Sequence, residues 1–130
     1  MVDKMSDAQL FGSCPGDERQ LLQSLVVPMR VSAGNEVIGQ GDFGASIGVL
    51  LEGQASVWRD GEHVADLAPG SVFGELAALA PPSTSGQRTA SIRAETEVRV
   101  ETVAAADINS ELSSLPHVAD ALRSLAAKRR

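Results

Sequence analysis

The sequence predicts a β-rich α+β domain, a roll or sandwich of about eight strands with helices at both ends. Between residues 26 and 103, short β-branched or alternating segments are broken repeatedly by Gly and Asp, as is typical of closely spaced strands. Before and after this region, apolar residues recur every three or four positions, which is helical spacing. A chain of 130 residues has room for one domain around a single core.

The composition indicates an acidic globular chain. Hydrophobic residues make up 43% and charged residues 22%, which excludes disordered and fibrous classes. The 11 Lys and Arg against 17 Asp and Glu give a net charge of −6, which disfavours direct binding to nucleic acid. No apolar run approaches the roughly 20 residues of a bilayer span, and residues 1–7 lack the apolar core of a signal peptide. We therefore expect a cytoplasmic protein that does not engage a membrane.

The first element is a helix within residues 1–25. Pro15 stands near its first position, acidic residues follow in the first turn, and Leu21, Leu22 and Leu25 give it an apolar face. Turn residues then alternate with strand patterns, as at 33–35 and 39–42. Strands are expected at residues 29–31, 36–38, 47–51, 55–58, 63–67, 89–93 and 98–103.

Two segments interrupt or follow the strands. Residues 73–87 read as a short helical turn and a Pro/Ser/Thr/Gly loop. After residue 103 helical spacing returns, and a basic C-terminus suits the helix dipole there. The apolar stripe of this last helix either packs on the strands or forms a dimer, and at this length we favour packing. Its members are Leu112, Leu115, Val118, Leu122 and Leu125.

A phosphate site is predicted where the interruption begins and ends. Gly74 stands directly before an Ala/Leu-rich helical turn, whose unpaired N–H groups favour an anion, and a glycine lets a ligand approach the backbone. Glu75 in the first turn can accept a hydrogen bond from a sugar hydroxyl. Arg88 opens the next strand, from which its planar guanidinium can reach a phosphate. Such residues are also common outside phosphate sites, so these motifs alone are suggestive only.

Phe73-Gly74-Glu75-Leu76-Ala77 followed by Arg88-Thr89-Ala90 resembles the phosphate-binding cassette of cyclic nucleotide-binding domains, the family of catabolite activator protein and protein kinase A regulatory subunits. Residues 31–42, 51–57 and 67–73 are similar to further motifs of that family, so that the resemblance covers residues 10–127. It implies a mainly β (α+β) fold. This is an eight-stranded antiparallel β-roll of jelly-roll type with an N-terminal helix, a short phosphate-cassette helix and a C-terminal helix.

The resemblance also implies a layout and a function. The expected layout is one domain over residues 1–130, in which 1–25 is helical, 26–103 is the β-roll with its cassette at 73–90, and 104–130 holds the C-terminal helices. The expected function is a regulatory cyclic nucleotide sensor, without catalysis, cofactor or metal. Its signal passes through the C-terminal helix to an effector protein or fused domain. We expect a monomer or a weak homodimer through that helix.

The implied ligand is cAMP or cGMP. Glu75 would accept the ribose 2′ hydroxyl, and Arg88 would pair with the cyclic phosphate. Thr89 would touch phosphate or base, which leaves the identity of the base undecided. The expected ligand-binding residues, several through their backbone, are Phe73, Gly74, Glu75, Leu76, Ala77, Arg88, Thr89 and Ala90.

Two departures from the family pattern keep an alternative open. Arg88 comes 13 residues after Glu75, more than is usual in the family, with the excess in residues 81–87. Because the sequence ends at Arg130, we also expect the lid over the base to be short or missing. The alternative is a degenerate β-roll that serves protein interaction and no longer binds nucleotide.

Four other residues are given structural roles. His63 and His117 lack a third ligand to form a metal site, which disfavours a metal-dependent β-roll enzyme. Trp58 lies in an alternating strand and is expected to pack there, half-buried. Cys14 is the single cysteine, so it forms no internal disulfide and is interpreted as an inert thiol.

Overall fold

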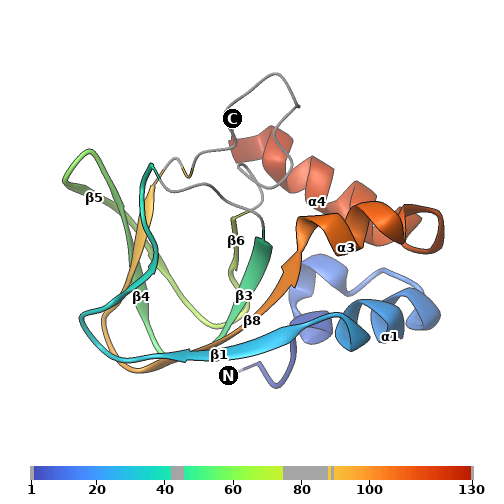
Figure 1. The fold of residues 1–130 in the computed structure, drawn as a ribbon, viewed down its shortest axis with the longest axis horizontal. Coiled ribbons are helices and arrows are strands. Elements are labelled where there is room, and N and C mark those ends of the chain that lie inside the picture. Colours follow the sequence, from blue (N-terminus) through green and yellow to red (C-terminus); the bar gives the residue numbers. More distant parts are fainter. Residues whose placement is uncertain (1, 42–45, 75–87, 89, 130) are drawn as a thin grey trace.

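The protein is a roll of two antiparallel sheets with its helices gathered beside it (Figure 1). The computed structural model describes residues 2–41, 46–74, 88 and 90–129. Within them, the strand orders are β1-β8-β3-β6 and β2-β7-β4-β5, four strands in each sheet. The predicted eight-stranded antiparallel β-roll is therefore confirmed. The strands are β1 Val27–Val31, β2 Glu36–Ile38, β3 Ser46–Glu52, β4 Ala55–Arg59, β5 Glu62–Leu67, β6 Val72–Phe73, β7 Ser91–Ala94 and β8 Val98–Ala104.

The helices come from both ends of the chain and lie next to β8 (Figure 1). Among those described, none is long and apolar enough to cross a membrane. The expected cassette helix falls on residues 75–87, outside the described residues. The helices are α1 Gly16–Ser24, α3 Ala105–Ser110 and α4 Pro116–Arg129, with single 3-10 turns η1 Met5–Asp7, η2 Gln9–Phe11 and η3 Leu112–Ser114.

Several elements differ from the sequence-based expectation, among them β1, which begins at Val27 where residue 29 was expected. The last helix begins at Pro116, because proline has no N–H to donate and fits a first turn, so Leu112 lies in the separate turn η3. The strand expected at 89–93 is β7, which begins at Ser91, after a bend at Ala90, and extends to Ala94 through its pairing with Ala55 of β4. The two-residue strand β6 was not predicted. It pairs with β3 through Phe73 and Gly48.

Two apolar clusters flank β3, whose side chains alternate between them. Leu50 points into the roll, where it packs with residues of β6, β7 and β8. Ile47, Val49 and Leu51 point to the other side, against the helices. The predicted apolar stripe packs into this second cluster, since Leu115, directly before α4, and Val118 and Leu122 of α4 are fully buried there. The packing interpretation of the stripe is confirmed for these three residues.

Candidate functional site

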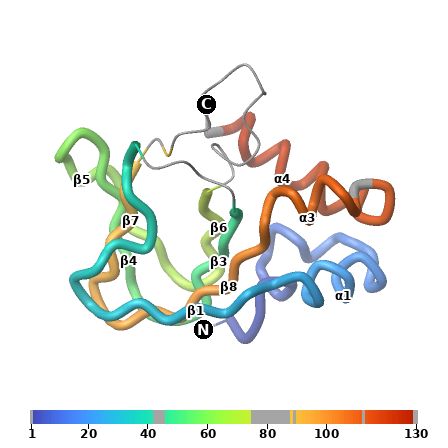
Figure 2. Tube along the Cα trace, viewed as in Figure 1, coloured from blue at the N-terminus to red at the C-terminus, as the bar shows by residue number. Residues whose placement is uncertain are grey.

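The site centres on a buried arginine that joins two strands. The whole of Arg88 is only 7% exposed. Its Nη1 donates to the carbonyl oxygen of Gly74 at 3.1 Å, and its Nη2 donates to the carbonyl oxygen of Ser46 at 3.1 Å and to the Ser46 hydroxyl at 3.4 Å. Gly74 directly follows β6 and Ser46 begins β3, strands that run side by side in the Cα trace (Figure 2). A buried charge persists only where such partners hold it, so this guanidinium is fixed in place.

Gly74 is required at its position for a steric reason. Its φ is +86°, in the left-handed region that favours glycine. A Cβ there would lie 2.7 Å from Arg88 Nη1 and 2.7 Å from the Ser46 carbonyl oxygen. The sequence predicted that Gly74 lets a ligand approach the backbone, whereas in the structure it is the Arg88 guanidinium that lies against it.

Ser46 was not found by sequence reasoning. It holds Arg88 chiefly through its backbone carbonyl, which every residue carries, so no residue type marks this role. Its hydroxyl adds a second, longer contact. A polar residue at the start of an apolar strand was the one available signal, and it is a weak one.

Gly48 is a second residue that sequence reasoning missed. A Cβ there would lie against Cζ of the Phe73 ring and 2.6 Å from its Cε2. The Phe73 ring, which belongs to the cluster inside the roll, thus occupies the space over Gly48. Gly74 follows Phe73 directly in the chain. The packing of the Phe73 ring over Gly48 therefore helps to position the Gly74 carbonyl oxygen, which accepts from Arg88.

The structure brings together three of the expected site residues. Phe73, Gly74 and Arg88 meet at the end of β6, and Ala90 follows in a bend before β7. The N–H of Gly41 donates to the backbone carbonyl of Arg88 at 2.9 Å, so the turn before β3 also touches the cassette. The other four expected residues, Glu75, Leu76, Ala77 and Thr89, lie outside the described residues.

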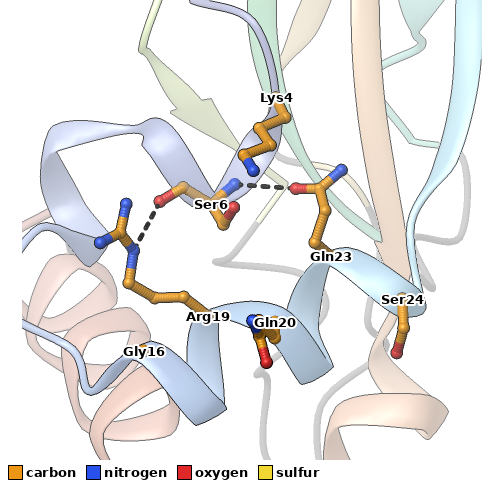
Figure 3. A pocket seen from close by; sticks show the side chains of 7 residues that line it. All are labelled: Lys4, Ser6, Gly16, Arg19, Gln20, Gln23 and Ser24. Atoms are coloured by element: carbon orange, nitrogen blue, oxygen red, sulfur yellow. Dashed lines mark hydrogen bonds between the residues drawn. The ribbon is translucent and has the colours of Figure 1, made fainter.

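A polar cavity of about 490 Å³ lies elsewhere, between η1 and α1 (Figure 3). Ser6 contacts two of the side chains that line it: its N–H donates to Gln23 Oε1 at 3.1 Å, and its carbonyl accepts from Arg19 Nε at 3.2 Å. All the lining residues come from the N-terminal helical segment and none from the cassette. They are Lys4, Ser6, Gly16, Arg19, Gln20, Gln23 and Ser24.

The residues given structural roles have structural contacts. The Trp58 side chain is half-buried, with the guanidinium carbon of Arg93 4.6 Å from its ring centroid, which confirms the packing role. His63 Nε2 lies 2.7 Å from Asp66 Oδ1. Cys14 is buried, and burial raises the pKa of its thiol, as expected of an unreactive cysteine.

Comparison with known proteins gives consistent matches. The family model described as cyclic nucleotide-binding domain matches residues 28–114, about two thirds of the chain. The potassium/sodium hyperpolarization-activated cyclic nucleotide-gated channel 4 of Oryctolagus cuniculus is 33% identical over 96 residues, which is 74% of this chain and 8% of the channel. This chain therefore spans only a small part of that relative's length.

Two solved structures share the fold at similar identity. One is the N-terminal domain of a transcriptional regulator from Streptomyces coelicolor A3(2), with a TM-score of 0.74, 29% identity, and coverage of 92% of this chain and 85% of that one. The other is the Thermus thermophilus catabolite activator protein, with a TM-score of 0.80, 28% identity, and coverage of 92% of this chain and 57% of that one.

Proposed function

The chain belongs to the cyclic nucleotide-binding domain family, and from this premise we propose that it is a regulatory module whose ligand is cAMP or cGMP. The observation that carries the proposal is the buried Arg88 guanidinium, held where β3 and β6 meet. A guanidinium that is held in place presents its planar N–H donors for the bidentate binding of a phosphate, and the cyclic phosphate is such a group.

Preorganisation explains how the phosphate would be recognised. The carbonyl oxygens of Gly74 and Ser46 accept from the two terminal nitrogens and thereby fix the plane of the guanidinium. A planar donor that is already oriented loses little freedom when an anion binds to it. In this proposal, Glu75 accepts the ribose 2′ hydroxyl, and the backbone around it together with Thr89 completes the contacts.

Binding acts through a shift in conformation rather than through catalysis. We propose that nucleotide binding repositions α4, which lies beside the roll (Figure 1). The receiver of the signal is an effector protein or a fused domain. Two of the similar proteins support such a receiver, because one is a cyclic nucleotide-gated channel and the other is the N-terminal domain of a transcriptional regulator.

The test is calorimetric titration of cAMP and cGMP into wild type, Arg88→Ala and Arg30→Ala. Arg30 is the matched control, because it lies on the roll surface in an exposed ion pair with Glu97 at 3.2 Å. Loss of Arg88 should weaken binding by about 1.5 to 3 kcal/mol, the scale of a hydrogen bond to a charged group, and Arg30→Ala should bind like wild type.

Two results would overturn the proposal. Equal affinity of the Arg88 variant and wild type would remove Arg88 from the site. Absence of binding by folded wild type would favour the degenerate interaction module. A circular dichroism spectrum of each variant separates loss of binding from loss of fold.

A further inference from the structure

The first turn of α4 has no capping side chain of its own. Pro116 is the first helical residue, and Leu115 before it is fully buried, with no side-chain oxygen. The early backbone N–H groups of any helix have no partner within the helix. Ser, Thr, Asp or Asn at the residue before the helix normally accepts from them. Here the acceptor has to come from another part of the chain.

Glu18 of α1 provides that acceptor from 100 residues away in sequence. Its Oε1 accepts from the N–H of His117 at 2.8 Å and from the N–H of Val118 at 3.1 Å. Its Oε2 also contacts Nδ1 of the His117 side chain. One carboxylate thus binds the second and third residues of α4, as a side chain directly before a helix ordinarily does.

The burial of Glu18 distinguishes this contact from a surface ion pair. The Glu18 side chain is only 5% exposed, whereas the His117 side chain is 61% exposed. Burial by itself raises the pKa of Glu18, but hydrogen bonds from Val118 and His117 outweigh it, so that this pKa lies below the ordinary carboxyl value. The group is therefore a carboxylate at neutral pH, at the positive end of a helix dipole.

The two helices also share a core. Leu22 of α1 and Val118 and Leu122 of α4 are fully buried in the cluster against the outer side of β3. The burial of apolar side chains is non-directional and does not by itself pair a particular atom of α1 with a particular atom of α4. The carboxylate adds directional hydrogen bonds at one point of this apolar contact, and so it fixes the position of α4 along α1.

We propose that Glu18 is a coupling residue, which fastens α4 to α1 so that a displacement of α4 carries the N-terminal helix with it. This inference rests on the proposed function, in which nucleotide binding repositions α4. Its consequence is that the surface presented to an effector includes α1 as well as α4. A partner that contacts either α1 or α4 would then respond to the same ligand-driven change.

The test is hydrogen–deuterium exchange of the whole chain, with and without saturating cAMP, in wild type and three variants. Glu18→Ala removes the cap, Glu18→Gln keeps a carbonyl oxygen in its place, and Asp17→Asn neutralises the exposed neighbouring acid as a control. In Glu18→Ala we expect the amides of His117 and Val118 to exchange about fivefold faster or more, the factor that corresponds to a typical cap. Glu18→Gln should restore most of that protection.

The coupling has a readout that a purely structural role would not change. In wild type and Asp17→Asn, cAMP should alter exchange in both α4 and α1, whereas in Glu18→Ala it should alter α4 only. If cAMP alters exchange in α1 of Glu18→Ala as much as it does in wild type, the inference is overturned. It is also overturned by a wild type in which α4 responds to cAMP and α1 does not.

A ligand-free arm separates this inference from the proposed function. Arg123 of α4 is exposed, so Arg123→Gly loosens the helix without touching the core. In the wild-type background this change should raise exchange in α1 as well as in α4, and with Glu18→Ala it should raise exchange in α4 alone. If Arg123→Gly raises exchange in α1 equally in both backgrounds, or raises it in neither background, Glu18 does not couple the helices. Failure of both cAMP and cGMP to alter α4 in wild type would instead count against the proposed function.

Discussion

Replacing Gly74 by Ala tests whether the close approach of Arg88 is as tight as the structure shows. The matched control is Gly34→Ala, because Gly34 has a φ of +88°, close to the +86° of Gly74, and nothing within 4 Å of an added Cβ. Both variants place alanine in the left-handed region, which costs about 1–2 kcal/mol. Only at Gly74 would the new Cβ also lie 2.7 Å from Arg88 Nη1 and from the Ser46 carbonyl oxygen.

The difference in the free energy of unfolding between the two variants therefore measures the cost of displacing the Arg88 guanidinium. Each hydrogen bond from a charged donor contributes about 1.5–3 kcal/mol, so Gly74→Ala should lose at least about 2 kcal/mol more free energy of unfolding than Gly34→Ala. Urea unfolding monitored by circular dichroism gives both values. Nucleotide affinity should fall in Gly74→Ala and persist in Gly34→Ala. Equal losses of stability in the two variants would refute the steric argument.

Three further predictions follow from the packing and the charges. Gly48→Ala forces its Cβ against the Phe73 ring and should reduce the free energy of unfolding by about 1–3 kcal/mol, which urea denaturation would show; an unaffected midpoint would mean that the ring moves freely. Because the folded pKa of Glu18 is lowered, its stabilisation is present above the ordinary carboxyl pKa and is lost as pH falls through it and on toward the folded value. The urea midpoint of wild type should thus fall more steeply than that of Glu18→Gln as the pH is lowered from about 5 to about 3, and parallel curves over that range would contradict this. Arg93→Gln removes the cation over Trp58 and should change its fluorescence while reducing stability by no more than about 1 kcal/mol; an unchanged emission spectrum would show that the contact is absent in solution.

The sequence was most informative where structure is local. Strands β2 to β5 and β8 were predicted almost to their ends, because alternation and Gly or Asp turns are read from neighbouring residues. The strand β6 was missed because two residues, Val72 and Phe73, are too few to show a period. The start of α4 was misplaced because leucine spacing continues across Pro116, the residue that begins the helix.

The candidate site divides in the same way. Gly74 and Arg88, which are in contact in the structure, were selected from the sequence because the cassette motif carries them. Ser46 binds Arg88 through its backbone carbonyl, and Gly48 leaves room for the Phe73 ring because it has no side chain. Neither role can be recognised from the residue type alone. Glu18 is an ordinary first-turn acid of α1 by sequence, and only the packing of the chain ends brings it to α4. Contacts between residues so far apart require the tertiary structure.

The central claim is that the buried Arg88 guanidinium is the anchor for a cyclic phosphate. The most direct measurement is ¹⁵N NMR of the arginine side-chain nitrogens in wild type, with the Arg88 signals assigned by their loss in Arg88→Lys. We expect cAMP or cGMP to shift the Arg88 guanidinium signals, and adenosine and guanosine, which lack the phosphate, to leave them in place. Nucleotide binding that leaves these signals unmoved, or no binding at all, would contradict the account.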